Sequence, residues 1–132
     1  MAKRNPREYQ TQQVHYLRKT VNFNDAGIAS GVYMGTLPAG AQIVDTVVNV
    51  VTAFNAVSTN VLTVGTNSTS YDNIVAAANV DESSATGQRV TTGLGLELAA
   101  DADVYAKYTQ SGTAADAGQA VIVIAYVPNN DR

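Results

Sequence analysis

The chain has 132 residues, a length that favours one domain with a core large enough to fold without disulfides. It contains no cysteine, which excludes disulfides, cysteine-based metal sites and cysteine nucleophiles. Charged residues make up 14% of the chain, well below the roughly 25% of ordinary soluble domains. So few charges are expected where neighbouring subunits cover the surface, although a surface rich in threonine and asparagine gives the same composition.

The first 20 residues are basic, whereas the rest of the chain is acidic. Five cations and one acid lie in residues 1–20, and three cations and ten acids lie in residues 21–132. This asymmetry predicts a basic N-terminal arm over residues 1–13, which meets an acidic partner, and a single domain over residues 14–132. A solvated, frayed terminus is the alternative. Nucleic acid is not an expected partner, because the acidic body would repel phosphates. The predicted partner-binding residues are Lys3, Arg4, Arg7, Tyr9, Arg18 and Lys19.

Alternating apolar and polar residues predict four strands in the first half of the chain, over residues 14–23, 31–37, 41–54 and 60–66. The third strand is long enough to need an internal bulge. Without a bulge, Ile43 and Val47 share one face of it, and Val44 and Val48 share the other. The loop over residues 55–60 has the size of a hairpin, so the fourth strand is expected to pair back onto the third.

The second half predicts a short helix over residues 70–78, with Ser70 as its N-cap, and an edge strand near residues 88–92. Alternating leucines predict a strand over residues 94–99, and another follows over residues 101–110. Residues 118–127 are the most hydrophobic. Val121 and Val123 should face one way, and Ile122 and Ile124 the other, as in a central strand.

Seven or eight short strands without β-α-β alternation predict an all-β fold. The expected architecture is an antiparallel β-sandwich, jelly-roll-like, with about eight strands and an extended N-terminal arm. The first twelve residues are polar, so no secretory signal peptide is expected. No apolar stretch approaches the roughly 20 residues of a membrane span. The chain is therefore expected to be made in a cytoplasm and to bind no membrane.

No motif for catalysis, cofactors or metals stands out, so no enzyme activity and no cofactor are predicted. His15 is the single histidine, and it has no second imidazole or triad partner in sequence order. Asp101 and Asp103 lack the spacing of a calcium loop, because Tyr105 and Ala106 occupy the positions that should follow. Five tyrosines could stack on sugars or cover the edges of the core: Tyr33, Tyr71, Tyr105, Tyr108 and Tyr126.

Three segments resemble small virion proteins of tailed bacteriophages. They are TLPAGAQI at residues 36–43, VVTAFNAVSTNVLTVGT at residues 50–66 and GQAVIVIAYV at residues 118–127. These segments consist of turn-forming residues and core valines, so they carry fold rather than activity. The resemblance covers roughly residues 31–127 and implies a capsid decoration (cement) protein, or another head or tail component.

The function predicted from this resemblance is to decorate and stabilise a capsid by binding the lattice of the major capsid protein. The expected location is the capsid exterior of the virion, after synthesis in the host cytoplasm. The weakly charged surface predicts a homodimer or homotrimer. Two alternatives from other classes are a carbohydrate- or receptor-binding sandwich of a phage fibre or tail, and a hydrolase of cell-wall sugars. The first requires an exposed aromatic cluster with acids or amides, and the second requires two converging carboxylates.

Overall fold

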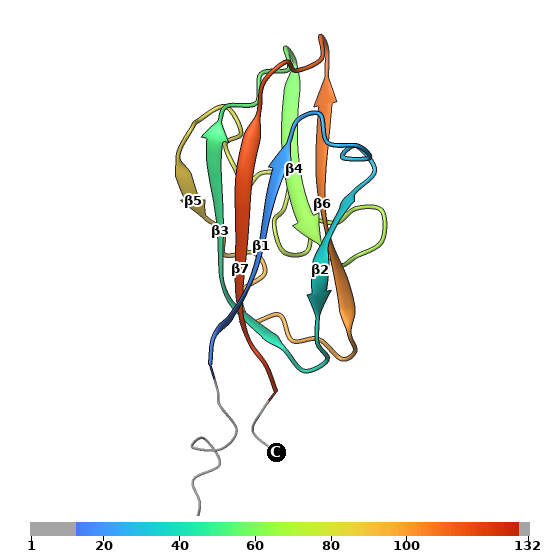
Figure 1. The fold of residues 1–132 in the computed structure, drawn as a ribbon, viewed down its shortest axis with the longest axis vertical. Coiled ribbons are helices and arrows are strands. Elements are labelled where there is room, and N and C mark those ends of the chain that lie inside the picture. Colours follow the sequence, from blue (N-terminus) through green and yellow to red (C-terminus); the bar gives the residue numbers. More distant parts are fainter. Residues whose placement is uncertain (1–12, 130–132) are drawn as a thin grey trace, which may run out of the picture.

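The structure, a computed structural model, describes residues 13–129. Its seven strands are β1 (His15–Asn22), β2 (Val32–Leu37), β3 (Gln42–Thr52), β4 (Thr59–Gly65), β5 (Gly87–Arg89), β6 (Ala102–Ser111) and β7 (Gln119–Val127). They form one antiparallel sheet in the order β1-β7-β3-β5 and a second in the order β2-β6-β4. In Figure 1 the strands β5, β3, β7 and β1 lie side by side in that order.

The strand order confirms the predicted β-sandwich of jelly-roll type. Odd-numbered strands form one sheet and even-numbered strands the other, so the chain crosses between sheets at each step from β1 to β4. The place of an eighth strand, beside β4, is taken by a single bridge between Val64 and Val75. Seven strands and one bridge therefore stand where about eight strands were expected. The predicted arm falls almost entirely on residues outside the described range.

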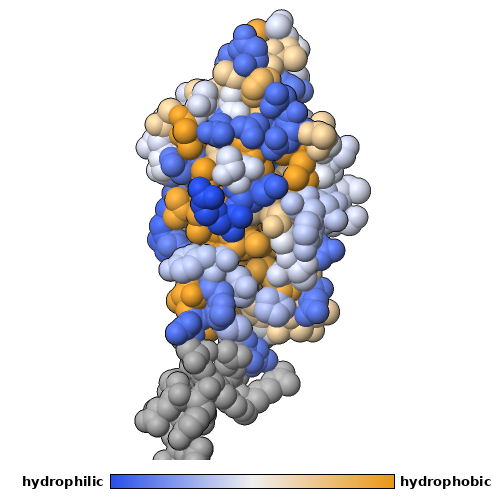
Figure 2. All heavy atoms as spheres, viewed as in Figure 1, coloured by the Kyte–Doolittle hydropathy of each residue, from blue (hydrophilic) through white to orange (hydrophobic). Residues whose placement is uncertain are grey.

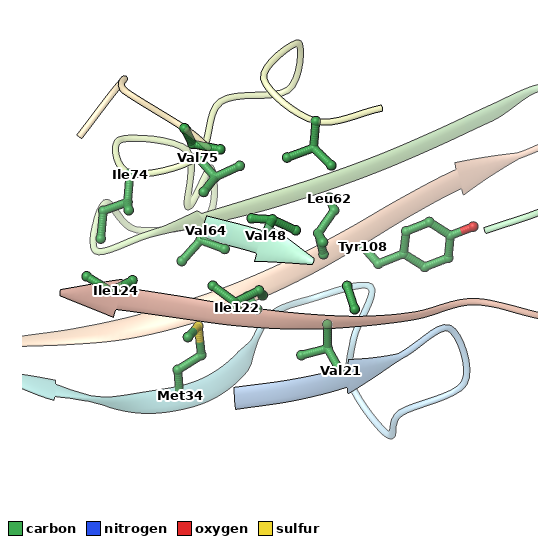
Figure 3. Close-up of a cluster of buried hydrophobic side chains, with 14 of the residues drawn as sticks. Val21, Met34, Val48, Leu62, Val64, Ile74, Val75, Tyr108, Ile122 and Ile124 are labelled. Atoms are coloured by element: carbon green, nitrogen blue, oxygen red, sulfur yellow. The ribbon is translucent and has the colours of Figure 1, made fainter. Parts of the chain in front are cut away.

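The core lies between the two sheets and consists mainly of valine, isoleucine and leucine. Figure 3 shows Val48 and Ile122 of one sheet facing Leu62 and Val64 of the other. Tyr108 is also buried, and its ring lies 4.7 Å from that of Phe54. Aliphatic side chains from both sheets thus fill most of the interior, and among the described residues Glu82 is the one buried charged residue.

Strand β7 is central, as predicted, because it pairs with β1 on one side and β3 on the other. Ile122 and Ile124 are fully buried, whereas Val121 and Val123 are half-buried on the outer surface. The two apolar faces of this strand therefore have different environments. One belongs to the core, and the other is available for contact with another molecule.

Strand β3 carries the predicted bulge and a second one. The register with β7 shifts between Ile43 and Asp45 and again between Val50 and Thr52. The first shift corrects the expected faces, because Ile43 joins the buried side at 1% exposure, whereas Val44 turns outward at 40% exposure. The second shift turns Thr52 outward next to Val51, which alternation already places outside and which is 47% exposed. The first bulge thus places an additional valine on the surface, whereas the second adds a threonine.

Three local predictions were wrong. Strand β4 does not pair back onto β3 but joins β6 in the other sheet. No helix forms over residues 70–78, where the amide side chains of Asn67, Asn73 and Asn79 bond to the backbone and compete with helical hydrogen bonds. Residues 94–99 form a turn with one bridge, between Glu97 and Gln42, because their backbone bonds go to the bulged start of β3. The predicted edge strand near residues 88–92 is present as β5.

Candidate functional site

No catalytic or metal centre is apparent in the part of the chain that the structure describes. No group of three or more His, Cys, Asp or Glu residues within 13–129 could hold a metal ion. Asp101 instead accepts a hydrogen bond from the backbone N–H of Ala39 at 2.8 Å. His15 stacks on Tyr126, with ring centroids 5.7 Å apart. No helix within the described range could cross a membrane.

The structure describes only two of the six predicted partner-binding residues. Lys3, Arg4, Arg7 and Tyr9 lie outside the described residues. Arg18 and Lys19 both lie in β1, an edge strand, where neighbouring side chains point to opposite faces. Arg18 is exposed on the outer face, opposite Val123, whereas Lys19 is half-buried on the inner face, opposite Ile122. The structure therefore separates these two cations, which the sequence placed together.

The first candidate site is the outer face of the four-stranded sheet. Its apolar residues come from β1, β3 and β7, and we call them the valine face: Tyr16, Val44, Val47, Val51, Val121 and Val123. Tyr16 is 68% exposed. Register places Val47, Val123 and Arg18 in one row across the sheet. Figure 2 shows orange apolar side chains between blue polar ones on the side of the sandwich in view.

Charge on this outer face is nearly balanced. Arg89 of β5 donates to the carboxylate of Asp45 at 2.9 Å, the single ion pair found within the described range. Arg18 lies on the same face as a further cation, without an ion pair to any residue in 13–129. Exposed apolar side chains set among polar ones, with few uncompensated charges, are typical of a protein–protein contact.

The second candidate site is a cluster of three tyrosines on the outer face of the other sheet. The Tyr105 ring of β6 stacks on Tyr71 at 4.8 Å and meets Tyr33 of β2 edge-on at 5.8 Å. We call these three residues the tyrosine platform. Tyr33 is 50% exposed, and the other two are half-buried. The neighbours of Tyr105 in the sheet are Tyr33 on one side and Gly65 of β4 on the other.

A structured loop between β4 and the Val75 bridge holds Tyr71 in place. The side-chain oxygen of Asn67 accepts hydrogen bonds from the backbone N–H groups of Asp72 and Asn73. Tyr71 has a φ of 44° and Thr69 has a φ of 65°, a region that bulky side chains rarely adopt. The loop lies against Gly65, where a Cβ atom would come within 2.4 Å of the Asn73 side chain. The strain and the tight packing fix the position of the Tyr71 ring.

Glycine is also required beneath that ring. A Cβ atom on Gly31 would lie 2.7 Å from the Tyr71 ring, so only glycine allows the ring to lie this close to the chain. Lys107 of β6 extends to the same loop, and its ammonium group donates to the backbone oxygen of Thr69 at 3.0 Å. The platform is therefore supported from both sides.

Two consecutive side-chain hydrogen bonds lie at the edge of the tyrosine platform. The Thr36 hydroxyl donates to the carboxylate of Asp103 at 2.8 Å, and it lies 2.6 Å from the Tyr33 hydroxyl. Because the single proton of Thr36 is already engaged, Tyr33 donates to Thr36. Asp103 is exposed and keeps lone pairs free for a further donor.

One buried carboxyl group lies apart from both surfaces. Glu82 is 6% exposed, and its side chain accepts the backbone N–H of Leu62 at 2.9 Å. Its backbone oxygen accepts the N–H of Phe54, so this residue links the end of β3 to β4. Burial raises the pKa of Glu82 above its ordinary value. Burial, together with the nearby Glu82 carboxylate, also raises the pKa of Tyr108.

Sequence reasoning did not predict either surface as a site. The sequence showed each tyrosine separately, but the contact between their rings depends on the register that pairs Tyr33 with Tyr105. The outward position of Val44 depends on a bulge whose place the alternation of residues does not reveal. The available signal was the run of valines in residues 41–54, on both faces of one strand.

No protein-family profile matches the sequence, and no curated protein matches it. The fold, however, recurs in solved structures. A chain of the cyanophage Pam1 capsid asymmetric unit is 18% identical, with a TM-score of 0.69, over 89% of this chain and 86% of that one. A chain of the acidic stable capsid structure of Helicobacter pylori bacteriophage KHP30 is 20% identical, with a TM-score of 0.64, over 89% and 90%.

A chain in the capsid of Ralstonia phage GP4 is 18% identical, with a TM-score of 0.65, over 89% of this chain and 85% of that one. All three similarities span nearly the whole length of both chains, so they concern the complete sandwich rather than one motif. The fold is therefore one that chains of phage capsid structures adopt. This finding agrees with the resemblance carried by residues 36–43, 50–66 and 118–127.

Proposed function

We propose that the chain is a structural protein of a phage virion that decorates and stabilises the capsid by binding the lattice of the major capsid protein. The observation that carries this proposal is the fold, which three phage capsid structures share over 89% of the chain. The sequence resemblance to small virion proteins supports the same conclusion independently. The proposed location is the outside of the capsid, after synthesis in the host cytoplasm.

The valine face is the proposed contact with the shell. Two of its valines, Val44 and Val51, lie in β3 and are 40% and 47% exposed to solvent. Covering apolar surface stabilises a contact by about 25 cal/mol for each Å² removed from water. The Asp45–Arg89 pair leaves little uncompensated charge to desolvate on this face. Shape and apolar contact, rather than charge, would therefore provide most of the binding to the shell.

The proposed partners also include further copies of this chain, as a homodimer or homotrimer, and the basic arm would assist either contact. Arg18 supports this role, because it is exposed at the edge of the sandwich beside the start of β1. Lys19 supports it less, because its side chain is half-buried on the inner face. Single exposed ion pairs contribute only about 0–1 kcal/mol, so the arm would act through several contacts together.

A second candidate function is binding of carbohydrate or another receptor by a fibre or tail component. The tyrosine platform favours it, because exposed rings beside Asp103 can stack on a sugar and accept bonds from its hydroxyl groups. However, Tyr71 and Tyr105 stack on each other at 4.8 Å, which leaves less ring surface for a sugar. The structure therefore supports carbohydrate or receptor binding less well than it supports capsid decoration.

Co-sedimentation with shells of the major capsid protein from the same virus tests the proposal. The double variant Tyr16→Asp/Val51→Asp places two charges on the valine face at exposed positions, so the fold should tolerate it. Bound protein should fall by about tenfold or more, the equivalent of about 1.4 kcal/mol. The matched control is Val57→Asp, at a valine that is 73% exposed in the loop after β3.

The control variant should bind shells as the unmodified protein does. Equal binding by all three proteins would show that the valine face is not the contact. No binding of the unmodified protein to shells would contradict the decoration role itself.

A further inference from the structure

The tyrosine platform has an acidic border. Every second residue from the position before β6 onward faces outward. These residues are Asp101, Asp103, Tyr105 and Lys107. Asp72 follows Tyr71 directly and is exposed. Three carboxylates and one ammonium group give this face a net charge of −2. None of these carboxylates forms an ion pair with the residues that the structure describes, because Asp45 holds the one pair found there.

The single cation of the face does not neutralise this border. Lys107 donates to the backbone oxygen of Thr69 and so supports the loop that carries Tyr71. Asp72 accepts from the amide of Asn67, and Asp103 accepts from Thr36. These are neutral donors, so both negative charges persist. The face combines aromatic rings with uncompensated carboxylates, which is the chemistry that binds arginine and lysine side chains.

Residues 1–13 of the chain have the complementary composition. They contain Lys3, Arg4 and Arg7 against Glu8, a net charge of +2 that matches the −2 of the platform and its border. A guanidinium group over a tyrosine ring and beside a carboxylate gains from both groups together. The segment also contains Tyr9, whose ring can add to the cluster.

We propose that residues 1–13 of one copy dock on the tyrosine platform of a neighbouring copy. The place where the described chain begins favours a neighbour over the same copy. Figure 1 shows residue 13, the first described residue, at the end of the sandwich on the side of β3 and β7, away from β2 and β6. This proposal rests on the partner-binding role proposed for the arm, and it names the surface that receives the arm.

The same rings could instead receive a sugar, but the charges favour the arm. A neutral sugar would leave the net charge of −2 uncompensated, whereas the arm neutralises it. The strained Tyr71 backbone and the glycine beneath its ring fit either ligand, because both need a ring held rigidly at the surface. Charge is therefore the observation that distinguishes the two.

A complementation experiment with two variants tests the proposal in the absence of shells. One protein lacks residues 2–13 and keeps the platform. The other keeps the arm but carries Tyr33→Ala/Asp103→Lys, two changes at exposed positions on the platform and its border. Sedimentation velocity should show that each protein alone self-associates about tenfold more weakly than the unmodified chain. An equimolar mixture of the two should form a complex, because one supplies the platform and the other the arm.

The matched control is Asp116→Lys, which makes the same charge change in the loop between β6 and β7, at the other end of the sandwich. This variant should self-associate like the unmodified protein, and higher salt should weaken all of these complexes. Circular dichroism verifies that every variant is folded.

The proposal is overturned if the mixture does not associate although the unmodified protein does, because the arm then binds elsewhere or on its own copy. It is also overturned if the unmodified protein stays monomeric at several hundred micromolar. A third contradicting result is normal self-association of the platform variant together with lost binding to an array of pyranose oligosaccharides. Failure here leaves the decoration role intact, because shell co-sedimentation measures that role separately.

Discussion

Thr46 provides the sharpest test of how the core is held together. Its side chain is 0% exposed on the inner face of β3, and its hydroxyl oxygen has no hydrogen-bond partner. A buried hydroxyl without a partner costs about 1–3 kcal/mol, because it loses its bonds to water and gains none. Thr46→Val replaces that hydroxyl with a methyl group of similar size. We expect the variant to be more stable by about 1–2 kcal/mol.

For a domain of this length, such a gain raises the Tm by about 3–6 °C, which differential scanning calorimetry resolves. Thr59→Val is the matched control, because the Thr59 hydroxyl is exposed and lies 2.6 Å from that of Ser111. The control should leave the Tm unchanged or lower it slightly. An unchanged or lower Tm for Thr46→Val would refute the reasoning, since it would show that the hydroxyl has a partner in solution.

Three further predictions concern stability. Because burial raises the folded-state pKa of Glu82 above its ordinary value of 4.5, its contribution to stability is lost as pH rises through the raised pKa. Glu82→Gln should flatten this dependence in urea melts from pH 4 to 8, and parallel curves for both proteins would contradict the assignment. Gly118→Ala should destabilise the fold by about 2 kcal/mol in the same urea melts, because Gly118 has a φ of 151° and the new Cβ atom would lie 2.4 Å from the Phe54 ring. An unchanged urea midpoint would count against that packing. Deleting residues 2–13 should leave the Tm of a dilute, monomeric sample nearly unchanged, and failure to fold would make the arm a structural element.

The sequence predicted most strands well because alternation and turn residues are local signals. Residues 119–127 are apolar at nearly every position, so their central place between β1 and β3 followed from composition. The sheet to which β4 belongs did not follow, since a short loop permits either a hairpin or a crossover. The helix expected at residues 70–78 failed because Asn67 and Asn73 bond to the backbone, and helix propensity takes no account of such bonds.

The two surfaces were less predictable than the fold because each depends on contacts between distant parts of the chain. The platform needs residues 33, 71 and 105 to meet, and the strained backbone at Tyr71 has no sequence signature. The valine face includes Val44 only because of the first bulge in β3, whose presence could be expected but whose position depends on pairing with β7. The charge asymmetry of the arm, by contrast, is visible in the sequence itself.

Electron microscopy of the assembled particle tests the central claim most directly. The proposed function predicts density for this sandwich on the outside of the shell, with the sheet β1-β7-β3-β5 and its valine face turned toward the major capsid protein. Density at a fibre or tail tip, with the tyrosine platform turned outward, would contradict it. A particle without density for this chain would also contradict it.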